Sequence, residues 1–302
     1  MLLAATSGAA VSANESESPF VVGETGAAFG SVQGAIDAIG DGAGTILIAP
    51  GRYRQCGVQE GGEIAFVARQ PGTVVFDGKI CEGKAALVLG GRSATVTGLT
   101  FQNLKVPDGN GAGIRLQQGN LEVTESLFRD SQSGILSHAD PSATIRVDHS
   151  TFSGLGYCGD DCAHSIYIGQ YGRLIVTRSR FERGTGGHYV KSRAARTDVT
   201  ESSFDDSGGQ ATNYMIDLSN GGAGLIAGNV FVQGQDKENY SAMIAVAAEG
   251  AERESNGLAV RDNQASLAPG AKATSFLVDF SGDHIGLEQN RLDERIRSFE
   301  RR

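Results

Sequence analysis

The sequence predicts an all-β fold, a single-domain β-solenoid in which short parallel strands wind into successive coils. Three observations lead to this prediction. Glycine accounts for 43 of the 302 residues, about twice the usual share of ~7%, which indicates many tight turns. One sequence motif of alternating apolar residues recurs along the chain. Its copies follow one another at intervals of 27, 24, 29, 23 and 27 residues, the spacing expected of one coil of three short strands with their turns.

The repeated motif is a strand of alternating apolar and polar residues, followed by a polar pair and a large apolar residue. Strands this short, separated by Gly, Asn, Asp and Ser, exclude helical repeats. A β-sandwich is the rival interpretation, but it would show hairpin signals and would not keep a fixed interval over six copies. Each closing phenylalanine should therefore stack on its counterpart one coil away, about 4.8 Å off. The expected ladder consists of Phe101, Phe128, Phe152, Phe181, Phe204 and Phe231.

The repeat pattern of residues 20–295 resembles the pectin-lyase-like superfamily of right-handed single-stranded parallel β-helices. The segment AFGSVQGAIDAIGDGAGTILIAPGRY is similar to the usual start of such domains, an amphipathic helix followed by a strand and Pro-Gly-x-Tyr. Val32, Ala35, Ile36 and Ile39 share one helical face. The resemblance thus implies an N-terminal capping helix that covers strand edges at the open end of the solenoid.

The ends of the chain are expected to lie outside the solenoid. We assign residues 1–18 to a signal-peptide remnant or disordered N-terminus, 19–296 to the β-helix and 297–302 to a C-terminal tail. The first residues hold an apolar stretch ending in Val11-Ser12-Ala13, as at a signal-peptide cleavage site, although a basic n-region is missing. Together with the cysteines, this stretch predicts a secreted or periplasmic protein.

The four cysteines are an even number and can pair completely in an oxidising compartment. Cys56 and Cys81 are 25 residues apart, about one coil, so they are placed to bridge adjacent coils. A bridge from Cys158 to Cys162 would close a short loop. A zinc site at these two residues is disfavoured because no second pair has zinc-finger spacing. We predict no metal and no cofactor, with calcium as an open alternative for which no clear site is present.

Charge and hydropathy restrict the partners. The net charge of -9 argues against wholesale nucleic-acid binding. No apolar run approaches the ~18 residues of a membrane span. We expect a monomer whose partner is an acidic polysaccharide or oligosaccharide, which would need a local basic patch.

Such a patch is predicted on the strands that follow the phenylalanine turns. Strand alternation that directs Val190 inward directs its neighbour Lys191 outward. Tyr167 and Asp217 occupy the equivalent positions, 24 residues before and 26 residues after it. These three residues should form a column on three consecutive coils, and Arg193 joins Lys191 by the same alternation.

A second stack is expected at the strand entrances. His164, His188 and Tyr214 each precede a member of the column by three residues, although alternation alone would turn them inward. For either histidine alone, the alternative is a residue that only hydrogen-bonds backbone groups of its turn.

These residue types suit a glycan that carries carboxylates. In β-elimination of a uronic acid, the carboxylate is neutralised, a base removes the C5 proton and an acid protonates the departing oxygen. We predict Lys191 or His188 as the base, Tyr167 or His164 as the acid, and Arg193 as the neutralising group. The predicted substrate-binding residues are Tyr189, Tyr214, Asp217 and Arg115. Alternatively, Asp217 forms only an exposed ion pair with Lys191.

The segment GGHYVKSRAARTDVTESSF resembles the Lys-Ser element of the β-helical lyases of the chondroitinase B and alginate lyase family. That resemblance implies that Lys191 is the base. The family carries a catalytic arginine one coil later, where this chain has Asp217.

A second resemblance leads to an alternative reaction. Gly159-Asp160-Asp161-Cys162 is similar to the Gly-Asp-Asp-Cys element of polygalacturonases, which hydrolyse with paired carboxylates and inversion. Gly187-His188 matches their Gly-His element and Asp140 could supply an acid one coil earlier, but their Arg-Ile-Lys element is absent. The alternatives are therefore a hydrolase that uses Asp160 and Asp161, and a non-catalytic glycan-binding or cell-surface β-helix protein.

Overall fold

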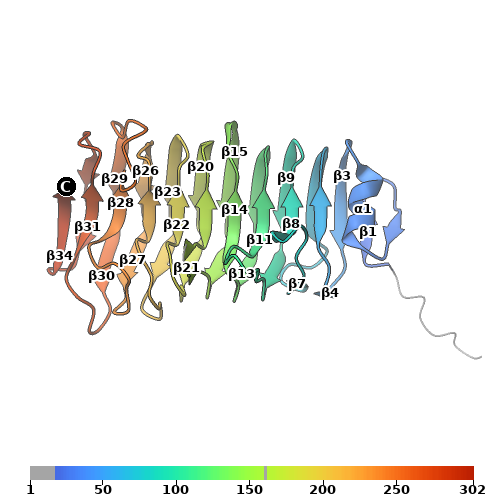
Figure 1. Ribbon diagram of the computed structural model, residues 1–302, viewed down its shortest axis with the longest axis horizontal. Helices are drawn as coiled ribbons and strands as arrows, with labels where there is room; N and C mark the ends of the chain where they lie inside the picture. Colours follow the sequence, from blue (N-terminus) through green and yellow to red (C-terminus); the bar gives the residue numbers. More distant parts are fainter. Residues whose placement is uncertain (1–17, 160–161) are drawn as a thin grey trace, which may run out of the picture.

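Short strands wind into stacked coils in the computed structural model, which describes residues 18–159 and 162–302. Each coil contributes one strand to each of three sheets that run along the molecule (Figure 1). Apart from β1 and β2 at the N-terminal end, the strands of these sheets pair in parallel, each with its counterpart one coil away. The predicted parallel β-helix is thus confirmed, and the β-sandwich alternative is wrong.

The first sheet has twelve strands and the other two have ten each. In chain order, the first consists of β1 (Phe20–Val22), β2 (Ala28–Phe29), β3 (Ala43–Ile48), β6 (Glu63–Ala68), β9 (Ser93–Thr97), β12 (Asn120–Thr124), β15 (Asp140–Asp148), β20 (Tyr171–Thr177), β23 (Arg196–Thr200), β26 (Ala223–Ala227), β29 (Leu258–Arg261) and β32 (Gly286–Glu288). The second consists of β4 (Gly51–Tyr53), β7 (Val74–Asp77), β10 (Leu99–Gln102), β13 (Leu127–Arg129), β16 (Thr151–Ser153), β21 (Arg180–Glu182), β24 (Ser203–Asp205), β27 (Val230–Gln233), β30 (Gln264–Leu267) and β33 (Arg291–Leu292).

The third sheet carries the candidate site. It consists of β5 (Gly57–Gln59), β8 (Ala85–Leu89), β11 (Ala112–Leu116), β14 (Ser133–Ser137), β19 (Ile166–Ile168), β22 (Val190–Ser192), β25 (Ile216–Leu218), β28 (Ala242–Val246), β31 (Thr274–Asp279) and β34 (Ile296–Arg301). A short antiparallel hairpin, β17 (Tyr157–Cys158) with β18 (Cys162–Ala163), stands before β19.

The core lies inside the coils, where alternate residues of all three sheets meet. The expected aromatic ladder is confirmed: from Phe101 to Phe231 successive ring centroids are 4.8–5.0 Å apart, and neighbouring rings are within 14° of parallel. This distance is the spacing between neighbouring strands, because each ring is carried by the same position of successive coils.

The turn between the first and second sheets has the same conformation in many coils. One residue has positive φ, as in Glu125 (49°), Arg178 (48°) and Asp262 (58°). A buried Ser or Asn follows it and bonds to its counterpart one coil away; for example, the Asn229 backbone N–H donates to Asn263 Oδ1 at 3.0 Å. This hydrogen bonding satisfies backbone groups that the sharp turn would otherwise leave buried and unpaired.

A helix closes the N-terminal end. Helix α1 (Val32–Ile39) is capped at its N-terminus by Ser31, whose Oγ accepts a hydrogen bond from the Gly34 N–H at 3.1 Å. Its apolar face is buried against the first coil through Val32, Ala35 and Ile36, so the predicted cap is confirmed (Figure 1). Within the part of the chain that the structure describes, no helix is long and apolar enough to cross a membrane.

Both predicted disulfides are present. Cys56 and Cys81 join neighbouring coils with a Cα–Cα distance of 5.5 Å, and Cys158–Cys162 closes the β17–β18 hairpin. The assignment of residues 297–302 to a tail is wrong, because β34 pairs with β31 over Ile296–Arg301. The many charges of this segment conceal its strand pattern. The predicted signal-peptide remnant falls almost entirely on residues 1–17, which lie outside the described residues.

Candidate functional site

The candidate site is a column of outward side chains on the third sheet. The strand register pairs Tyr167 with Lys191 and Lys191 with Asp217 on consecutive coils, as predicted. Leu136 and Arg115 continue the column towards the N-terminus, and Ala245 continues it towards the C-terminus. Chemically reactive side chains are therefore concentrated on β19, β22 and β25.

The strand entrances of the third sheet break the alternation. Two consecutive side chains point inward there: Tyr189 and Val190 are 1% and 0% exposed, and Tyr189 packs against Phe181 and Phe204 of the ladder. In two earlier coils glycine, Gly113 or Gly134, takes the first of these two positions. A Cβ at Gly134 would lie only 2.8 Å from Phe152.

This break agrees with the predicted position of the two histidines and corrects the prediction for Tyr189. The histidines that alternation alone would turn inward lie on the outer face. Tyr189, predicted to bind substrate, lies in the core, where its hydroxyl donates to Asp206 Oδ1 at 2.7 Å. Its side chain therefore cannot contact a ligand on the outer face.

The predicted second stack is formed. The ring centroids of His164 and His188 are 4.8 Å apart, and those of His188 and Tyr214 are 5.6 Å apart, with nearly parallel planes. All three residues are more than nine-tenths buried. Burial, followed by the charge of Lys191, lowers the pKa of His164 to about 3, and burial and the neighbouring His164 hold the pKa of His188 well below 6.5. Both rings are therefore neutral at pH 7.

One tautomer of His164 follows from its hydrogen bond. Its Nδ1 accepts from the His188 backbone N–H at 3.0 Å, so the ring proton of the neutral form is on Nε2. His164 therefore offers a donor at Nε2. The Nε2 atom of His188 instead lies 3.4 Å from Asp217 Oδ2.

Lys191 lies between two carboxylates. Its Nζ is 3.6 Å from Asp217 Oδ2 and also binds Glu249 Oε1. The alternative of an exposed Lys191–Asp217 pair is wrong, because both side chains are less than one-tenth exposed. Burial raises the pKa of Asp217, although Lys191 and a hydrogen bond from Ser219 oppose the shift.

Arg193 connects the column to its surroundings. Its Nε donates to the Tyr167 hydroxyl oxygen at 2.9 Å, and its other nitrogens bind Asn220 and Glu249. Burial lowers the pKa of Arg193, but the interactions with Tyr167 and Glu249 outweigh it and raise the pKa overall. Because the Tyr167 oxygen accepts from Arg193, its own O–H remains to donate into the groove.

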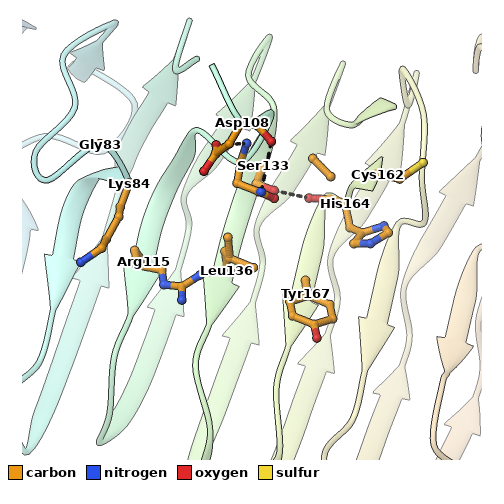
Figure 2. Close-up of a pocket in the computed structure, with 11 residues that line it drawn as sticks. Gly83, Lys84, Asp108, Arg115, Ser133, Leu136, Cys162, His164 and Tyr167 are labelled. Atoms are coloured by element: carbon orange, nitrogen blue, oxygen red, sulfur yellow. Dashed lines mark hydrogen bonds between the residues drawn. The ribbon is translucent and has the colours of Figure 1, made fainter. Parts of the chain in front are cut away.

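Two adjoining hollows form one groove along this face. One, of about 520 Å³, is lined by residues that include His188, Lys191, Arg193, Glu238 and Glu249. The other, of about 340 Å³, is lined by Lys84, Asp108, Arg115 and Leu136 among others (Figure 2). Cys162, His164 and Tyr167 line both. Each volume lies within the range of small-molecule sites.

Arg115 lies in the smaller hollow. Its side chain extends along the outer face of the sheet between Lys84 and Leu136 (Figure 2). Its Nε is buried without a partner in the described part of the chain, and burial lowers its pKa. Arg115 is thus placed to contact a ligand in the groove.

Among the described residues, none of the carboxylates predicted for hydrolysis is seen in the groove. Asp160 and Asp161 lie outside the described residues. Asp140 does not line the groove; it accepts from the Gly119 N–H at 2.8 Å and from Ser142 at the start of β15. Through these hydrogen bonds Asp140 stabilises the turns around it.

The sequence left a bound metal ion as an open alternative, and the loop around Cys158 and Cys162 is where one could be held. In residues 18–159 and 162–302, Cys158, Cys162 and Glu238 are the one group close enough to share an ion. The two cysteines form a disulfide and cannot supply thiolates, so these residues do not fit a metal ion.

The sequence did not predict several residues around the larger hollow, among them Asn213, Glu238 and Glu249, which line it, and Asn220, which binds Arg193. Each lies in a turn or loop, where the strand repeat does not predict side-chain direction. Neighbouring Lys237 is buried, with its Nζ 3.0 Å from Asp206 Oδ2.

The fold and the groove define a parallel β-helix protein with a polar groove on one sheet. The chain belongs to the family described as right handed beta helix region, whose model matches residues 84–271. No curated protein sequence matches the chain.

Several solved structures are similar to this chain at low sequence identity. A protein of Geobacillus virus E2, ORF18, is 12% identical with a TM-score of 0.50; the alignment covers 89% of this chain and 57% of that protein. The pectin methylesterase of Aspergillus niger is 12% identical with a TM-score of 0.49, covering 96% and 92%. The A-module of the Azotobacter vinelandii mannuronan C-5 epimerase AlgE4 is 13% identical with a TM-score of 0.42, covering 90% and 92%. The first of these likenesses shows the fold alone.

Proposed function

We propose that this protein cleaves an acidic, uronic-acid-containing polysaccharide by β-elimination in the groove of the third sheet. The observation that carries the proposal is the contact of Arg193 with Tyr167, next to Lys191 on the adjoining strand. A cation, a proton donor and an amine thus line one hollow that is large enough for a sugar.

The residues are assigned by what their atoms offer. Arg193 pairs with the uronate carboxylate, which makes the C5 proton more acidic. Lys191, which pairs with Glu249 as a cation at rest, first gives its proton to solvent. As an amine it then removes the C5 proton, and the C4–O bond breaks as a double bond forms between C4 and C5. Tyr167 gives its proton to the departing oxygen, with His164 Nε2–H as a second donor. His188 is a weaker candidate for the base, since its ring lies between those of His164 and Tyr214.

The proposal includes export to an oxidising compartment, which the two disulfides support. The substrate contacts proposed beside the reacting residues are Arg115 in the smaller hollow and the edge of Tyr214.

The test is turnover of polygalacturonate, alginate and chondroitin, followed by the absorbance of the unsaturated uronate product. Tyr167→Phe removes one hydroxyl and should lower kcat by about 10²–10⁴-fold, the usual contribution of a general acid. Tyr157→Phe is the matched control, because Tyr157 is 46% exposed and does not line the groove. Equal activity of both variants would overturn the assignment of Tyr167.

Glycan binding without catalysis is the second candidate. It is favoured by the engagement of Lys191 and Arg193 with Glu249, which leaves neither cation without a protein partner. Retained binding with no cleavage of any polymer would support it. Release of reducing ends without the unsaturated product would instead indicate hydrolysis and direct attention to Asp160 and Asp161.

A further inference from the structure

The carboxylate of Glu249 spans the two cations of the groove. Its Oε1 accepts from Lys191 Nζ and its Oε2 accepts from Arg193, so each oxygen binds a different cation. A carboxylate is the group that suits such a pair of donors, because it presents two oxygens in one plane.

The two cations are held in place by other contacts as well. Arg193 also binds the Tyr167 hydroxyl oxygen and Asn220 Oδ1. Lys191 is 9% exposed in its side chain and also faces Asp217. Their positions therefore do not depend on Glu249 alone, and a second carboxylate would meet them already oriented.

Glu249 reaches this place from outside the strand ladder. It lies in the loop after β28, and the outward position of β28 is the small Ala245, two coils beyond Lys191. The side chain of Glu249 is 40% exposed, compared with 24% for Arg193. Solvent adjoins it, so rotation of this side chain out of the groove meets no packed core.

We propose that Glu249 occupies the position of a ligand carboxylate, and that a uronate residue of an acidic glycan binds between Lys191 and Arg193 by displacing it. The groove is thus self-blocked in the absence of ligand. This inference rests on the proposed function for its substrate class. It is independent of whether the bound glycan is then cleaved.

The experiment measures binding by calorimetry with a galacturonate oligosaccharide and its fully methyl-esterified form. Glu249→Gln keeps the size of the side chain and removes its charge, so the acid oligosaccharide should bind about tenfold more tightly, equivalent to ~1.4 kcal/mol. The ester should show no such gain. Glu252→Gln is the matched control, because Glu252 is an exposed carboxylate of the same loop without an ion pair among the described residues. Thermal unfolding of both variants checks that each remains folded.

Unchanged or weaker binding of the acid oligosaccharide to Glu249→Gln would overturn the inference, as would the absence of binding to every variant. An equal gain in Glu252→Gln would also overturn it, since the effect would then be one of general charge. Tighter binding by Glu249→Gln without any unsaturated product would uphold the inference and overturn the lyase reaction.

Discussion

At the scale of single residues, the stacked histidines link the site to stability. His164 and His188 remain neutral in the folded chain because burial disfavours their charged forms. In the unfolded chain the same rings take up protons below their ordinary pKa of 6.5. The unfolded state therefore binds more protons than the folded state between pH 6.5 and about 3, and stability is lost as the pH falls through this range.

This linkage predicts the behaviour of His164→Gln. In the wild-type protein, each buried histidine should lower the free energy of unfolding by up to about 1.4 kcal/mol for each pH unit below 6.5. The variant should lose the contribution of His164, so its stability should depend less on pH between 6.5 and 4. Urea unfolding at several pH values measures this slope. His138→Gln, which changes an exposed histidine, should keep the wild-type slope; equal slopes in all three proteins would contradict the prediction.

The same scale shows what the sequence could predict of the site. Tyr167, Lys191 and Asp217 share a column because one position of the repeat recurs on three coils, which alternation reveals. Tyr189 was misplaced because two consecutive inward side chains interrupt the alternation. Glu249 was missed because its direction depends on a loop that folds back over two coils, a non-local contact that no repeat encodes.

At the scale of elements, the entrance of each strand in the third sheet must fit the aromatic ladder. Glycine at residues 113 and 134 leaves room for the rings of Phe128 and Phe152, whereas the coils from Tyr189 onward place large side chains there. This position of the repeat therefore accepts side chains of different size: glycine in two coils, the small Ala86 and Ser165 in two others, and a large side chain such as Tyr189 further along.

Gly134→Ala tests this packing. A Cβ at Gly134 would lie 2.6 Å from the Ser165 carbonyl oxygen and 2.8 Å from Phe152 Cδ1, so backbone or ring must shift. We expect a loss of about 1–3 kcal/mol in the free energy of unfolding, the usual cost of overpacking. Denaturant titration measures it. Gly208→Ala is the control, since its nearest neighbour would be Arg183 Cγ at 3.5 Å, and it should change stability little. An equal effect of both substitutions would refute the packing argument.

At the scale of the whole molecule, the fold was predictable because one sequence motif is repeated along the chain. The interval between phenylalanines sets the coil length, and the coil length sets the register of all three sheets. The ends were less predictable. Strand β34 carries three charged residues among its six, so its pairing with β31 depends on the neighbouring coil rather than on its own pattern. Most contacts in this architecture join adjacent coils.

Stability should therefore be local along the solenoid. Replacement of Cys56 and Cys81 by serine opens a loop of 25 residues between neighbouring coils, which should cost about 3–4 kcal/mol by the loop-entropy relation. Because coils contact their neighbours, the loss should concentrate around β5 and β8. Native-state hydrogen exchange should show faster exchange there and unchanged exchange in β28 and β31. The wild-type protein under the same conditions is the reference. Uniformly faster exchange from β5 to β31 would mean instead that the coils unfold as one cooperative unit.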